Sequence, residues 1–258
     1  MSCSLCGADI CSIGHILTSC KFALKDKRYT FRHDSVLLTL EQYIRRQLHA
    51  VNSKPYQKKV IPHISQSFTK PGAEAKLIAS PSFDSGCFTG ARDWQMLVDY
   101  DHRRITFPPE IIITTARPDI IIWSMSIKKI FLFELTVPLE ENFGDASSRK
   151  TTRYHELCDD INSSTCWRAS HFPFEVGARG FVARSTRGLL KKLGIPNHLR
   201  SSIIKSLSSI AAKSSFIILR SHNSFEWDRK RPLLQLKQEV EEQGAMNASP
   251  LESLNGDP

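Results

Sequence analysis

The chain has 258 residues, which is enough for one substantial domain with a small appendage. It carries 35 Lys and Arg against 26 Asp and Glu, a formal net charge of +9. Basic pairs and triplets recur along its whole length, which favours a polyanionic partner such as nucleic acid; the alternative is a solvated basic surface. No run approaches the roughly 18–20 apolar residues of a membrane span, and no signal peptide opens the chain, so we expect no membrane association.

Cysteine and histidine gather in the first 34 residues, in the order Cys3-x2-Cys6-x8-His15-x4-Cys20. These four ligands have a spacing that can close a tetrahedral zinc site, and a segment this short would need the metal to fold. Cys11 is a spare thiol that can substitute for a neighbour or lie buried. The alternative is a cluster of small buried cysteines, for which the segment has little core. Seven cysteines without a secretory signal indicate an intracellular, reducing compartment.

The next stretch, from Lys21 to Arg32, is basic with aromatic residues interleaved. An apolar-periodic segment follows, and Asp34 or Ser35 can cap it, which predicts a helix to about His49. Recurrent prolines and glycines then predict an irregular linker with short strands from residue 51 to residue 93.

Two apolar runs, Ile120–Trp123 and Ile130–Phe133, flank a short polar segment and predict the strands of a hairpin. The runs are continuous, which indicates burial on both faces inside an α/β domain. Asp119 opens the first run and Glu134 follows the second, so the hairpin brings them nearly opposite, at roughly 4.5–5.5 Å between Cβ atoms. Carboxylates this close repel unless they share a cation or proton, and a divalent metal explains the pair. Alternatively, polar residues simply mark the strand ends, and an Asp after Pro caps a turn.

Hydrophobic periodicity predicts the remaining elements as a strand, a core strand or turn, a helix, a strand and two helices. In that order they are Trp94–Tyr100, Ile111–Ile113, 144–162, Phe172–Ala178, Val182–Leu193 and Arg200–Ile218. The order predicts an α/β fold with a mixed sheet flanked by helices.

One face of the predicted 144–162 helix is basic. Lys150 and Tyr154 share this face at i,i+4, and Arg149 and Arg153 form a parallel pair beside them. Such a face is more often solvated, but its position after the hairpin makes it a candidate to point at the carboxylates.

Three motifs in order resemble the C-terminal part of site-specific non-LTR retrotransposon polyproteins, over roughly residues 1–225. Those proteins carry a Cys-Cys-His-Cys knuckle and a restriction-like endonuclease downstream of their reverse transcriptase. The Cys3 to Cys20 cluster fits the knuckle spacing, and Arg32-His33-Asp34 resembles the short basic motif that follows it. Arg117-Pro118-Asp119 followed by Glu134 resembles the endonuclease signature.

The resemblance implies a restriction-endonuclease-like fold of the PD-(D/E)xK superfamily with a small N-terminal zinc knuckle. It assigns structural Zn²⁺ to the cysteine cluster and catalytic Mg²⁺ to Asp119 and Glu134. Thr136 stands where the superfamily has its lysine, so Lys150, which resembles a relocated lysine, and Tyr154 become the further catalytic candidates. The candidate nucleic-acid contacts are Arg32, His33, Arg117, Arg149 and Arg153.

The resemblance therefore implies an Mg²⁺-dependent endonuclease that nicks target DNA in the nucleus, with RNA as a second partner. Because the family's reverse transcriptase precedes the knuckle, we expect a fragment that lacks this upstream region. The competing hypothesis is a catalytically inactive relic that binds nucleic acid through the knuckle and basic surface, and a third is a structural zinc domain. The expected organisation is a knuckle with basic motif (1–34), a helix and linker (35–95), an endonuclease domain (96–225) and a disordered tail (226–258).

Overall fold

The computed structural model describes residues 2–54, 86–100, 106–225 and 227. Most of the predicted linker and tail lie outside this range. The elements are η1 (His15–Ser19), α1 (Lys21–Lys25), α2 (Arg28–Asn52), β1 (Trp94–Val98), β2 (Ile120–Ser124), β3 (Lys129–Thr136), η2 (Glu140–Asn142), α3 (Phe143–Ser164), β4 (Arg168–Glu175), α4 (Arg184–Lys192) and α5 (Asn197–Arg220).

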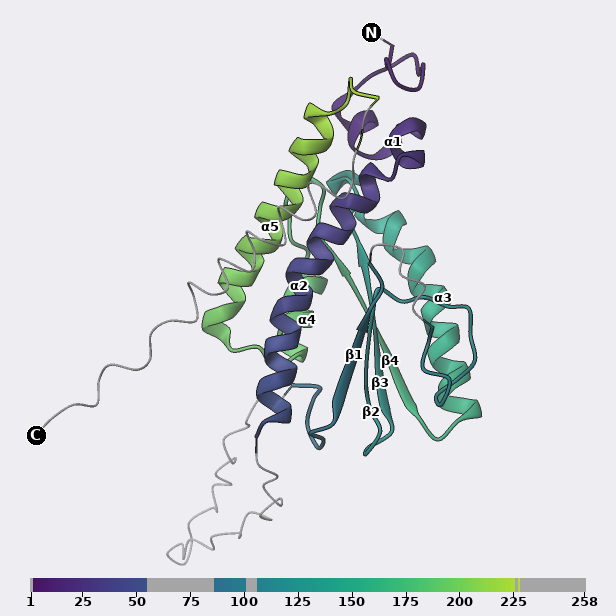
Figure 1. The fold of residues 1–258 in the computed structure, drawn as a ribbon, viewed down its shortest axis with the longest axis vertical. Helices are drawn as coiled ribbons and strands as arrows, with labels where there is room; N and C mark the ends of the chain where they lie inside the picture. Colours follow the sequence, from purple (N-terminus) through teal and green to yellow (C-terminus); the bar gives the residue numbers. More distant parts are fainter. Residues whose placement is uncertain (1, 55–85, 101–105, 226, 228–258) are drawn as a thin grey trace, which may run out of the picture.

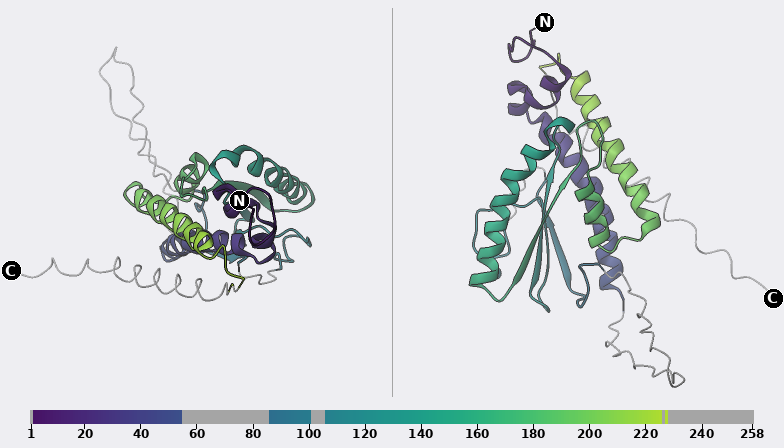
Figure 2. Two further views of the ribbon diagram at one scale, coloured as in Figure 1. Left: turned by 90° about the horizontal axis from the view of Figure 1, so that it is seen from above. Right: turned by 180° about the vertical axis from the view of Figure 1, so that it is seen from behind.

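The described strands form one mixed sheet in the order β1-β2-β3-β4. β1, β2 and β3 pair antiparallel, and α3 returns the chain so that β4 pairs parallel to β3. Helix α3 covers one face of the sheet, and α2, α4 and α5 cover the other (Figures 1 and 2). The predicted α/β architecture, a mixed sheet flanked by helices, is confirmed.

The central strands are buried on both faces, as their continuous apolar runs predicted. In β2, Ile120 and Ile122 join the core beneath α2 and α5, whereas Ile121 and Trp123 join a second core beneath α3. The two cores alternate along the strand because successive side chains point to opposite faces. The same alternation determines on which face of the sheet the side chains at the strand ends lie.

Helix α5 lies beside α2 along its length (Figure 1). Within the described residues it is the one helix long and apolar enough, by length and composition, to cross a membrane. Its residues Ile203, Leu207 and Ala211 are buried in the core shared with α2 and the sheet. A helix that packs in a protein core passes the same test of length and composition.

Some predicted boundaries were wrong. Helix α2 begins at Arg28, after Lys27 in the left-handed region with φ of 62°, so Asp34 lies inside the helix and the proposed boundary at 34/35 divides it. The last strand runs from Arg168 because it pairs with the whole of β3, starting opposite Lys129. Of the two alternatives predicted for Ile111–Ile113, a strand or a turn, the structure has the turn, over residues 109–111, and Ile111 is buried in the core beneath α3.

Candidate functional site

Asp119 and Glu134 lie together at one end of the β2–β3 pair. Ile120 pairs with Phe133, so the two acidic residues form the next facing position. The Asp119 backbone N–H donates a hydrogen bond to Glu134 Oε2 at 3.3 Å, and the Glu134 side chain is buried. Residues two apart on a strand share a face of the sheet. Ile121 and Leu132 lie in the core beneath α3, so Asp119 and Glu134 also belong to the face covered by α3. The predicted juxtaposition of the two carboxylates is present.

Two donors hold the Asp119 carboxylate. The Leu135 backbone N–H donates to Asp119 Oδ2 at 2.6 Å, and His33 Nε2 lies 3.3 Å from the same oxygen. The other ring nitrogen of His33 lies 3.2 Å from Asp34 Oδ1. Burial disfavours the imidazolium, but the charges and hydrogen bonds of Asp119 and Asp34 outweigh it and raise the pKa of His33 to about 10. His33 is therefore a cation between two carboxylates at neutral pH.

This ion triad predicts a pH dependence of stability. The pKa of His33 is higher in the folded protein than its ordinary value of about 6.5, so its stabilisation is complete below that value and is lost as pH rises towards 10. Without added Mg²⁺, the difference in melting temperature between wild type and His33→Gln should shrink between pH 7 and pH 10. His198→Gln, an exposed position on α5, is the matched control and should track wild type. Parallel curves for wild type and His33→Gln would contradict the triad.

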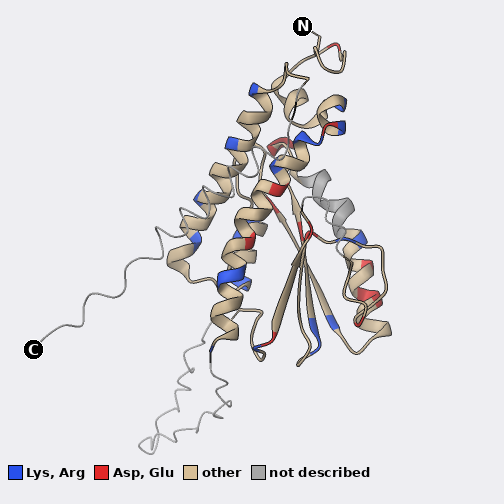
Figure 3. Ribbon diagram, viewed as in Figure 1, with Lys and Arg blue, Asp and Glu red and all other residues tan. Residues whose placement is uncertain are grey.

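A cleft of about 300 Å³ opens beside the triad. It is lined by Thr30, His33, Asp34, Asp99, Tyr100, Arg117 and Asp119. Arg117 contacts Asp99 at 2.8 Å, and its side chain remains 45% exposed. Figure 3 shows acidic residues where the strands converge between α2 and α3. The cleft lining thus carries three carboxylates, Asp34, Asp99 and Asp119, against two cations, His33 and the more exposed Arg117.

Tyr154 of α3 lies at the same site. Its hydroxyl donates to the Arg117 backbone carbonyl at 2.9 Å, which fixes the segment that leads into β2. Burial, and then the charges of Glu134 and Asp119, raise the pKa of Tyr154 above its ordinary value, so the hydroxyl stays protonated. The Arg153 guanidinium lies 5.9 Å from the centre of the Tyr154 ring. Lys150 and Arg149 belong to the same helix, but their side chains lie outside those the structure describes.

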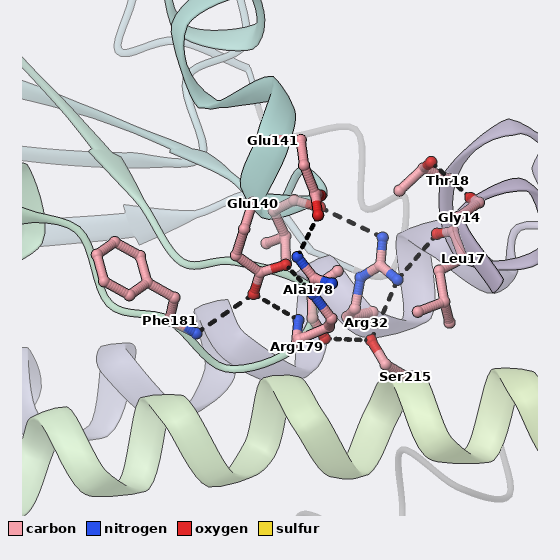
Figure 4. Close-up of polar contacts among 11 residues, drawn as sticks. Gly14, Leu17, Thr18, Arg32, Glu140, Glu141, Ala178, Arg179, Phe181 and Ser215 are labelled. Atoms are coloured by element: carbon pink, nitrogen blue, oxygen red, sulfur yellow. Dashed lines mark hydrogen bonds and ion pairs between the residues drawn. The ribbon is translucent and has the colours of Figure 1, made fainter.

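Arg32 has a different position from the one predicted. Its side chain is buried, and Figure 4 shows the guanidinium between separate segments of the chain. It donates to the Leu17 carbonyl at 3.0 Å, to Ser215 Oγ at 3.2 Å and to the Val137 carbonyl at 3.3 Å. Burial lowers the pKa of Arg32 to about 10. Arg32 joins the cysteine-rich segment to the segment after β3 and to α5, and it is not placed to contact a phosphate.

The predicted zinc ligands converge. The ligand atoms of Cys3, Cys6, His15 and Cys20 all lie within 4.8 Å of one another. Zn–S bonds of about 2.3 Å and Zn–N bonds of about 2.0 Å imply separations of roughly 3.8 Å between sulfurs and 3.5 Å between sulfur and nitrogen in a tetrahedral site. The observed separations are 3.9 Å for Cys3 to Cys20 and 3.3 Å for Cys6 to His15. This cluster can hold a metal ion and fits zinc.

The local backbone builds this cluster. The Gly7 N–H donates to the Cys3 carbonyl at 2.9 Å, and Gly7 has a φ of 73°, which glycine adopts without strain. Burial raises the pKa of the Cys3 thiol, but the Cys6 and Leu5 backbone amides and the neighbouring Cys6 and His15 side chains lower it to about 6. Cys3 is therefore readily available as the thiolate that binds metal.

Sequence reasoning did not identify Asp34 and Asp99 as cleft residues, nor His222 as a neighbour of the cysteines. Asp34 was interpreted as a helix cap, and neither Asp99 nor His222 belongs to a recognisable motif. In comparisons with known proteins, the chain matches no family model and no curated protein.

Proposed function

We propose that this chain is an Mg²⁺-dependent DNA endonuclease with a restriction-endonuclease-like core, derived from a non-LTR retrotransposon polyprotein. The observation that carries the proposal is the convergence of Asp119 and Glu134 at the ends of paired strands, beneath the helix that bears Tyr154. A mixed sheet with helices on both faces is compatible with such a core. In the parent polyprotein the nick would prime reverse transcription in the nucleus.

The donor set suits magnesium. Mg²⁺ binds through oxygen and commonly uses one or two carboxylates together with substrate phosphates. Asp119, which lines the open cleft, and the buried Glu134 next to it offer these carboxylates. When bound, the ion would supply a Lewis acid to the scissile phosphate and an activated water.

The other residues of the site would orient the metal-binding carboxylates and neutralise the charge of the DNA phosphates. His33 and the Leu135 N–H hold the Asp119 carboxylate, and Tyr154 holds the backbone at Arg117. The exposed guanidinium groups of Arg117, at the cleft, and Arg153, over the Tyr154 ring, are the candidates to contact DNA phosphates. Lys150, one helical turn before Tyr154, is the candidate to orient the attacking water.

The direct test is nicking of supercoiled plasmid by the full chain. The protein is dialysed free of Mg²⁺ and then titrated with Mg²⁺ or with Ca²⁺. We expect nicking that rises with Mg²⁺ and binding without cleavage in Ca²⁺. DNA bound in both conditions and cut in neither would refute the endonuclease and leave a binding protein.

That second candidate, an inactive nucleic-acid-binding relic, has two observations in its favour. Asp119 Oδ2 already accepts a hydrogen bond from the Leu135 N–H and faces His33. In addition, among the described residues, groups of three or more close metal ligands form in the cysteine region alone. Under this candidate the zinc cluster and the basic surface bind nucleic acid, and Mg²⁺ has no effect on DNA.

Both candidates predict strongly salt-dependent binding. Each phosphate contact by Lys or Arg releases counterions, so affinity for duplex DNA should fall by about 10³-fold between 50 and 200 mM salt if about six contacts form. Arg153→Ala should reduce the log–log slope by about one, measured by fluorescence anisotropy. Arg45→Ala is the matched control, because Arg45 is paired with Glu41 on α2 far from the carboxylates. A flat salt dependence would indicate a protein partner instead.

A further inference from the structure

A second set of metal ligands adjoins the predicted zinc cluster and comes from the two ends of the described chain. Cys11 Sγ lies 3.4 Å from His222 Nε2, and Cys3 Sγ lies 3.7 Å from the same nitrogen. The ligand atoms of Cys3, Cys11 and His222 all lie within 4.8 Å of one another. Cys3 thus belongs to both sets.

The geometry of this second set matches zinc as well as the first does. A tetrahedral zinc with ordinary bond lengths separates sulfur and nitrogen ligands by roughly 3.5 Å. The two sulfur–nitrogen separations at His222 lie on either side of that value. We propose that the protein binds two Zn²⁺ ions, the second held by Cys3, Cys11 and His222, with the Cys3 thiolate shared between the two metals.

Hydrogen bonds to the residues around His222 hold it in position. Arg28, fully buried, donates to the carbonyls of Ser221 and Ser224, on either side of His222, at 2.5 and 2.7 Å. Ser4 Oγ donates to Asn223 Oδ1 at 3.1 Å, which brings the N-terminal loop to the same turn. His222 itself is buried, with 7% of its surface exposed. The imidazole is therefore held at the thiols by contacts that do not depend on any metal.

The charges and coordination positions also balance. Each thiol releases its proton to solvent as the metal binds, and two Zn²⁺ ions neutralise the four thiolates of the joined cluster. The first ion has four protein ligands, as in a structural site. The second has three, which leaves one position for water or an added thiol, the arrangement of zinc sites that can still accept a ligand. The joined cluster would fasten the N-terminal segment to the end of α5, independently of any nuclease activity.

The test is the zinc content of the full chain, by native mass spectrometry and by release of zinc with a thiol-blocking mercurial. We expect two Zn²⁺ per wild-type chain and one in each of Cys11→Ser and His222→Ala. His198→Ala, an exposed histidine at the start of α5, is the matched control and should retain two. Because two variants are tested, the result still stands if one of them, Cys11→Ser or His222→Ala, fails to fold.

Substitution of Co²⁺ gives a second readout, because thiolate-to-cobalt charge-transfer absorption reports the number of thiolate ligands. Added thiol should shift the spectrum of wild type but not of His222→Ala. One Zn²⁺ per wild-type chain, whether retained or lost in His222→Ala, would overturn the two-metal proposal. Equal zinc content of two in wild type, Cys11→Ser and His222→Ala would overturn the assignment of these ligands.

Discussion

Asp119→Asn and Glu134→Gln are each expected to remove Mg²⁺-dependent nicking while DNA binding persists. Each substitution keeps the shape of the side chain and removes one of the two charges that would hold the ion. The rate should fall by at least about 10²–10³-fold, the loss seen when one group that stabilises transition-state charge is removed. Plasmid nicking at saturating DNA measures the effect, and anisotropy in Ca²⁺ measures binding separately.

The two variants should differ in stability. Asp119 accepts a short hydrogen bond from the Leu135 N–H and contacts His33, so Asp119→Asn should cost about 1.5–3 kcal/mol, the range for hydrogen bonds to charged groups. Glu134→Gln relieves repulsion between the carboxylates and should stabilise the metal-free protein by about 0.5–1 kcal/mol. Urea denaturation without Mg²⁺ measures both changes.

Asp160→Asn is the matched control, because Asp160 is an exposed carboxylate on α3. It should leave nicking unchanged. If wild type cuts and Asp119→Asn cuts equally well, the two-carboxylate site is wrong. If both variants lose DNA binding together with cutting, the carboxylates maintain the folded structure and do not act as metal ligands.

The hairpin was predictable because its information is local. A short run of β-branched and aromatic residues predicts each strand. The length of the polar segment between the two runs determines the pairing register to within a residue. Register alone then brings Asp119 opposite Glu134. The cluster of Cys3, Cys6, His15 and Cys20 was predictable for the same reason, since these four residues lie within one short segment.

The errors arose where the decisive partner lies far along the chain. His222 is separated from Cys3 by nearly the whole described chain, and periodicity tells which face of α5 is apolar but not where its end docks. Asp99 reaches the cleft only because β1 pairs with β2. Both contacts follow from tertiary packing, on which composition and spacing carry no information.

The start of α2 shows how one local error spreads. Interpreting Asp34 as a helix cap left Arg28 and Arg32 outside the helix, and Arg32 was a candidate nucleic-acid contact. With the helix beginning at Arg28, the two arginines fall at i and i+4 and Val36 at i+8, on one buried stripe. The preference of Asp34 for a helix cap was overridden by the burial of Arg28 and Arg32, whose guanidinium groups donate to backbone carbonyls.

Arg32→Met is therefore expected to destabilise the protein by about 2–6 kcal/mol. The apolar side chain fills most of the space but leaves the Leu17 and Val137 carbonyls without their donor, at about 1–3 kcal/mol for each unsatisfied buried group. Arg32→Lys should recover little of this, because a single ammonium group does not reproduce the planar fork that bonds to several segments at once. Urea denaturation followed by circular dichroism gives the change in free energy of unfolding.

The matched control is Arg153→Met, in which an exposed guanidinium over the Tyr154 ring is lost. Its stability should stay within about 0.5 kcal/mol of wild type, as for most surface substitutions, while its affinity for DNA falls. Arg32→Met should show the opposite: lower stability, with unchanged DNA affinity and salt slope for the fraction that remains folded. An Arg32→Met variant as stable as wild type but weakened in DNA binding would return Arg32 to the nucleic-acid surface, as its sequence motif first indicated.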